Sequence, residues 1–105
     1  MMSVPSREVT RHELNRLFNS GEYVERVQSG SLTTTLKRNS HRQRPTPTLP
    51  YCTRSQIVNY YDASGERVAV VHQFLLPDGS LGGSGTPEPK RLWIDGVTYY
   101  VPSGA

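Results

Sequence analysis

The chain has 105 residues, a net charge of +3 and one cysteine, Cys52. A single cysteine excludes an internal disulfide framework, and no apolar run approaches the length of a membrane span, so we expect a cytoplasmic protein. A hydrophobic fraction of 34%, with nine glycines and eight prolines, predicts one small domain over residues 1–105 with a modest core and long loops.

The positive charge is concentrated in one segment. Residues 37–54 hold five basic and no acidic side chains, so the rest of the chain is weakly acidic. The excess charge therefore describes this segment and not the whole fold. Its basic residues are Lys37, Arg38, Arg42, Arg44 and Arg54.

The clearest local signal near the N-terminus is a helix over residues 11–20. Thr10 and Glu13 have the spacing of a capping box, in which each side chain bonds to the backbone amide of the other. Gly21 is a suitable terminator. An apolar stripe at helical spacing follows the cap, made of Leu14, Leu17 and Phe18. We expect this stripe to pack on the core.

Residues 22–38 carry mixed signals. Apolar spacing favours a second helix over residues 22–28, a turn at residues 29–31, and a further helical turn from Leu32 to Leu36. The run of three threonines at residues 33–35 favours a strand instead. We interpret residues 8–38 as a helical part of the chain, with the strand alternative open.

A basic, proline-rich linker is predicted over residues 39–50. This stretch has three prolines and no apolar periodicity, which is typical of an extended and exposed segment. It would separate the helical part from a β-rich part over residues 51–102.

Two hairpins dominate the β-rich part. Apolar runs at residues 56–61 and 67–76 flank a turn sequence from Asp62 to Gly65, and residues 91–94 and 97–101 flank Asp95-Gly96. The second pattern indicates a type I′ turn, with positive φ at both central residues. We predict an α+β fold, with short N-terminal helices packed on one face of a small antiparallel sheet of about four strands.

His72 stands inside the most apolar run of the chain, at residues 67–76. Strand alternation places it on one face with Val70 and Phe74. In such a position a histidine is most often a core residue with one hydrogen-bond partner. The functional interpretation is a general acid or base whose pKa its neighbours adjust.

The connection over residues 79–89 is rich in glycine and ends just before Lys90 and Arg91. Its amides can turn toward an anion, although it matches neither common phosphate-binding fingerprint. It is either a flexible hairpin connection or an anion-binding loop. The candidate residues are Gly82, Gly83, Ser84 and Gly85.

We predict no metal and no other cofactor. The three histidines and Cys52 have none of the paired spacings that a zinc site needs.

Three functions are compatible with these patterns. We favour a small basic accessory protein that binds nucleic acid, RNA or single strands in particular, through Lys37, Arg38, Arg42, Arg44 and Arg54. One alternative is a metal-independent ribonuclease of the toxin type, in which His72 transfers a proton and Lys90 and Arg91 stabilise phosphorane charge. The other is a protein–protein interaction module of bacterial or viral origin.

Overall fold

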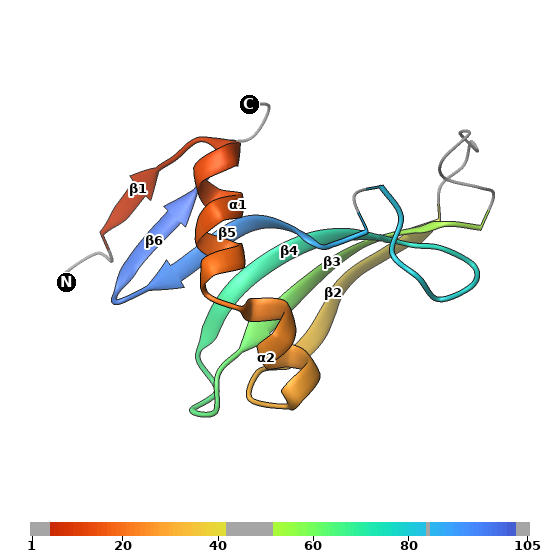
Figure 1. Ribbon diagram of the computed structural model, residues 1–105, viewed down its shortest axis with the longest axis horizontal. Coiled ribbons are helices and arrows are strands. Elements are labelled where there is room, and N and C mark those ends of the chain that lie inside the picture. Colours follow the sequence, from red (N-terminus) through yellow and green to blue (C-terminus); the bar gives the residue numbers. More distant parts are fainter. Residues whose placement is uncertain (1–4, 42–51, 84, 103–105) are drawn as a thin grey trace.

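A computed structural model describes residues 5–41, 52–83 and 85–102 of the chain. It shows a six-stranded sheet with two helices on one face (Figure 1). The elements in chain order are β1 (Ser6–Glu8), α1 (Arg11–Ser20), α2 (Tyr23–Ser29), β2 (Thr33–His41), β3 (Arg54–Tyr61), β4 (Arg67–Leu75), β5 (Glu88–Ile94) and β6 (Val97–Tyr100).

The α+β class is confirmed, but the sheet is larger than predicted. Its strand order is β1-β6-β5-β4-β3-β2, and every pair is antiparallel except β1 with β6. The two expected hairpins, β3–β4 and β5–β6, form its centre and pair through β4 and β5. The prediction missed both edge strands. β1 has three exposed residues and therefore no apolar pattern to reveal it.

The expected helical turn from Leu32 to Leu36 is wrong, because Thr33 to His41 form strand β2. This segment pairs with β3 as a strand, in agreement with the strand preference of the β-branched threonines. The pairing overrides the helical spacing of Leu32 and Leu36. The strand also takes in the first three residues of the predicted linker. The rest of that linker, with Arg42 and Arg44, lies outside the described residues.

The predicted first helix is α1, with the predicted bounds. The Glu13 amide donates a hydrogen bond to Thr10 Oγ1 over 3.1 Å, which is one of the two bonds of the predicted capping box. Gly21 ends the helix with an ordinary right-handed φ of −80°. Gly30 ends α2 with a φ of +88°, a conformation that favours glycine.

The core lies between the helices and one face of the sheet. Leu14, Phe18 and Tyr23 are buried on the helical side, and the Phe18 and Tyr23 rings stack with centroids 5.2 Å apart. The sheet contributes Val58, Tyr60, Ala69, Val71 and Leu92. Ala69 and Val71 alternate along β4 and are both fully buried, so the residues between them face the other way.

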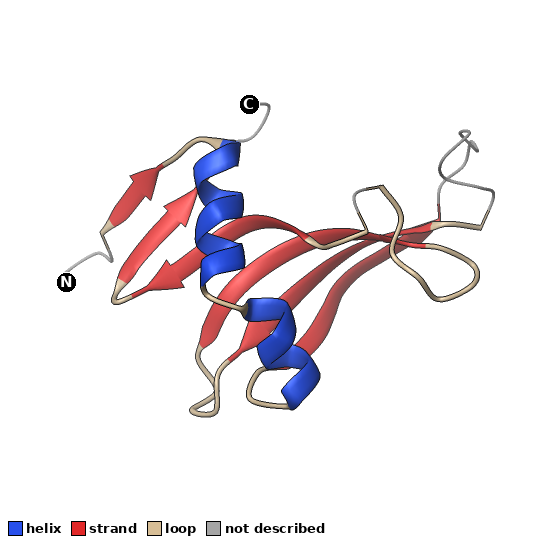
Figure 2. Ribbon diagram, in the orientation of Figure 1, coloured by secondary structure: helices blue, strands red, loops and turns tan. Residues whose placement is uncertain are grey.

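Among the described residues, no helix lies on the opposite face of the sheet (Figure 2). Both helices lie on the same side, and the far ends of β2, β3 and β4 extend beyond them (Figure 2). The uncovered face is therefore where side chains remain available to a ligand.

In the described part of the chain, no helix is long and apolar enough to cross a membrane.

A substitution at Gly21 tests the packing of the helices on the sheet. A Cβ atom at this position would lie 2.5 Å from Cε2 of Tyr23, a buried ring already stacked on Phe18. We expect Gly21→Ala to lower the free energy of unfolding by about 1–3 kcal/mol in urea titration, the usual result of overpacking. The exposed neighbour provides the control, since Ser20→Ala should change stability by less than about 0.5 kcal/mol. Stabilisation by Gly21→Ala, as at an unconstrained helical site, would contradict the packing described here.

Candidate functional site

Two β-bulges direct lysines onto the uncovered face. On β2 the pairing with β3 shifts between Leu36 and Arg38, which makes Lys37 an extra residue. On β5 the pairing with β4 shifts so that Lys90 is extra. Without the second shift, Lys90 would share a face with Leu92, which is fully buried in the core. A bulge redirects side chains in this way, and here it moves a cation away from apolar surroundings.

A hollow of about 510 Å3 crosses the strands on this face, and we call it the cationic trough. Five basic side chains and no acidic one line it. They come from α1, β2, β4 and β5, so elements distant in sequence meet here. The lining residues are Arg11, Lys37, Ile57, Arg67, Val70, Pro89, Lys90, Arg91, Val101 and Pro102.

The floor of the trough is apolar. Ile57 and Val70 are half-buried there, on neighbouring strands. Trp93 lies next to the trough, with the Arg67 guanidinium carbon 4.6 Å and that of Arg91 6.0 Å from its ring centroid. These distances allow cation–π attraction, which holds the two guanidinium groups over the sheet.

One carboxylate borders the trough. Glu88 forms salt bridges with Arg11 and with Lys90, the second over 3.4 Å. Burial, and then the charge of Arg11, lower the pKa of Lys90 below its ordinary value. The cations are thus close enough to repel one another, and an anion in the trough would relieve that repulsion.

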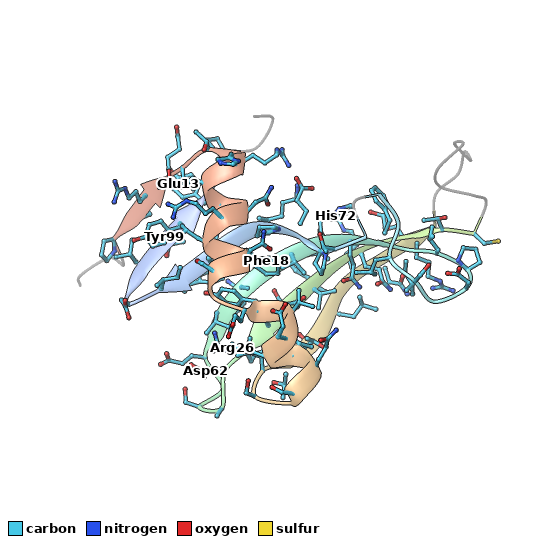
Figure 3. All side chains as sticks on the ribbon, in the orientation of Figure 1. Glu13, Phe18, Arg26, Asp62, His72 and Tyr99 are labelled. Atoms are coloured by element: carbon cyan, nitrogen blue, oxygen red, sulfur yellow. The ribbon has the colours of Figure 1, made fainter. Side chains whose placement is uncertain are left out.

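Figure 3 shows His72 near the loop that joins β4 to β5. The neighbouring Val71 is buried in the core, so strand alternation directs His72 to the other side of the sheet. Its Nε2 atom is 2.8 Å from Ser55 Oγ, and its ring meets Phe74 edge-on with centroids 4.7 Å apart. Burial, with a smaller effect from Lys90, lowers the pKa of His72 below 6.5. The imidazole is therefore neutral at physiological pH and has a hydrogen-bond partner.

A second hollow, of about 430 Å3, lies between α1 and the β4–β5 loop. Its lining includes His72, Gly82 and Gly83, but not Lys90 or Arg91. The three residues proposed for catalysis therefore do not line one hollow. Of the remaining loop candidates, Gly85 lies outside this lining and Ser84 is outside the described residues.

The residues that the sequence predicted to bind nucleic acid do not all lie in the trough. Lys37 lines the trough, and Arg38 follows it in register with Ile57. Arg54 begins β3 at the far end of the sheet, in register with Leu75. Sequence reasoning did not select Arg11 and Arg67, because only the fold brings them near Lys37 and Lys90. A bulge position is not visible in a single sequence, so nothing in the pattern pointed to this convergence.

No three His, Cys, Asp or Glu side chains gather as a metal site within the described ranges. The comparisons with protein-family models, curated proteins and solved structures found no match to this chain. Its function therefore has to be inferred from the geometry of the two hollows.

The environment of His72 predicts a pH dependence of stability. Because the pKa of His72 is lower in the folded than in the unfolded chain, the unfolded chain binds the proton more readily. Stability should be full above about pH 7 and should decline as the pH falls below 6.5 toward the folded-state pKa. Urea titrations from pH 8 to pH 5 should show a smaller decline for His72→Asn than for the wild type.

The same variant also tests the bond to Ser55. At pH 8 we expect His72→Asn to lower the free energy of unfolding by about 1 kcal/mol, and Ser55→Ala to have a similar effect. If acidification instead stabilises the wild type relative to His72→Asn, the pKa of His72 is raised in the folded chain. That result would contradict the lowered pKa given above.

Proposed function

We propose that the protein binds unpaired nucleic acid, either RNA or single-stranded DNA, in the cationic trough. The observation that carries this proposal is the gathering of five basic side chains, and no acidic one, around an apolar floor on the uncovered face of the sheet. Two of the cations reach that face through bulges, so the arrangement does not follow from ordinary strand alternation.

The number and spread of the cations favour a polyanion. A single small anion is satisfied by one or two basic groups, whereas these five come from four elements across the sheet. Arg38 continues the basic surface along β2 beyond Lys37. A chain of phosphates can neutralise several of them at once and release the counterions that they hold.

The apolar floor favours an unpaired strand over a duplex. Ile57 and Val70 offer a surface for a base or sugar between the charged groups. In a duplex the bases are stacked inside and only phosphates and groove edges face the protein. An unpaired base can instead lie on apolar or guanidinium surfaces, as is usual in single-strand recognition.

Binding is a better interpretation than ribonuclease activity. His72 is neutral and half-buried, which suits proton transfer, but it lies outside the trough lining that holds Lys90 and Arg91. Its Nε2 atom is already engaged with Ser55. The residues needed for cleavage therefore do not line one hollow, whereas the residues needed for binding do.

A charge-matched pair of variants tests the proposal. Lys37→Gln with Arg91→Gln removes two cations from the trough, and Arg7→Gln with Arg16→Gln removes two exposed cations from outside its lining. Fluorescence anisotropy with a labelled twelve-nucleotide RNA and its DNA counterpart should show weaker binding for the trough variant only. The slope of log Kd against log salt should become shallower by about 0.7 for each phosphate that the variant no longer neutralises, or about 1.4 for the two substitutions together.

Two outcomes would contradict the proposal. Equal weakening by both pairs of substitutions would mean that net charge matters and the trough does not. Cleavage of the RNA by the wild type in EDTA, abolished in His72→Asn while binding persists, would favour the ribonuclease alternative.

A further inference from the structure

Asn59 carries a buried oxygen without a hydrogen-bond partner. The residue is only 8% exposed, and its Oδ1 atom accepts no hydrogen bond from any described residue. Buried side-chain acceptors in proteins are nearly always satisfied, so an exception of this kind calls for an explanation. Its position in the sheet suggests one.

Asn59 adjoins the floor of the cationic trough, next to two of its lining residues. The neighbouring Tyr60 is buried in the core, so Asn59 faces the other way, toward the uncovered side. It is in register with Val70 on β4, and Ile57 is two residues before it on β3. Both of these residues line the trough. The residue with the unsatisfied oxygen therefore lies beside the apolar residues on which a base would rest.

We infer that Asn59 Oδ1 accepts a hydrogen bond from the exocyclic amino group of a base held in the trough, and so makes the protein prefer amino bases such as cytosine. This inference rests on the proposed function. A cytosine presents an N4 amino donor where a uracil presents the O4 acceptor. The uracil O4 atom would face Asn59 Oδ1, so two hydrogen-bond acceptors would meet in a desolvated place with no donor between them.

Two long cations of the trough come from β2 and β4, the strands on either side of Asn59. Lys37 stands two residues from Thr35, the β2 partner of Asn59 in the sheet register, and Arg67 lines the same trough from β4. Both side chains are long and exposed, so phosphates entering the trough can draw their charged ends away from the floor. Phosphate binding and base reading would then occur together.

A pair of pyrimidine oligonucleotides isolates the amino group. Labelled (dC)12 and (dU)12 have the same backbone, and their bases differ only in the group at position 4 and in the protonation of N3. We expect the wild type to bind (dC)12 about tenfold more tightly in anisotropy titrations at pH 7.5, as for one well-placed base contact. Asn59→Leu should abolish that preference and leave the affinity for (dU)12 within about twofold.

Two further variants separate recognition from folding. Thr35→Val alters the neighbouring position in the same register and should keep the preference. Asn59→Asp retains an acceptor, so it should still prefer (dC)12 while binding both oligonucleotides less tightly because of its negative charge. If Asn59→Leu does not fold, Asn59→Ser shortens the side chain and should abolish the preference in its place.

The outcomes separate this inference from the proposed function. If the wild type binds neither oligonucleotide, the proposed function fails and this inference fails with it. If it binds both equally, or prefers (dU)12, or if Asn59→Leu keeps the preference for (dC)12, nucleic-acid binding stands and only the role of Asn59 is overturned.

Discussion

One-sided packing is the constraint on which the rest of this structure depends. Two short helices place Leu14, Phe18 and Tyr23 against one face of a six-stranded sheet, and that face carries the fully buried Ala69, Val71 and Leu92. So few helical residues cannot cover both faces. The second face must be stabilised by its own side chains, which lie along it and leave their polar ends in solvent. An exposed face lined by polar side-chain ends is thus a direct consequence of how the core forms.

The cations that line the trough are held at a cost to the folded state. Arg11 and Lys90 are close enough for the charge of one to lower the pKa of the other. Glu88 offsets this repulsion through its salt bridges to both. Groups that destabilise a fold in this way are often kept for function. A phosphate chain would supply the missing negative charge, and this complementarity links the energetics of the fold to the proposed activity.

Local chemistry predicted much of the fold from the sequence. The Thr10 cap formed, and the Asp95-Gly96 turn has φ of 50° and 78°, both positive as a type I′ turn requires. These features depend on a few consecutive residues, so a single sequence contains them.

Features that depend on long-range pairing were not predictable in the same way. Strand β2 forms because β3 lies beside it, and the parallel strand β1 joins β6 from the other end of the chain. The bulges at Lys37 and Lys90 are properties of strand pairs, so alternation along either strand could not show them. For this reason the sequence divided the basic residues into a linker group and a loop group, whereas the fold brings Lys37, Lys90 and Arg91 to one hollow.

The proposed ligand would bind on the face of the sheet that the helices leave uncovered. The most direct test of this binding is an amide-resolved NMR titration of the whole chain with an unlabelled twelve-nucleotide single strand. We expect the largest chemical-shift changes at trough residues, among them Lys37, Val70 and Arg91, with α1 beyond its first turn little changed. Changes concentrated in α1, α2 and the hollow beside Gly82 would place the ligand outside the trough and contradict binding there.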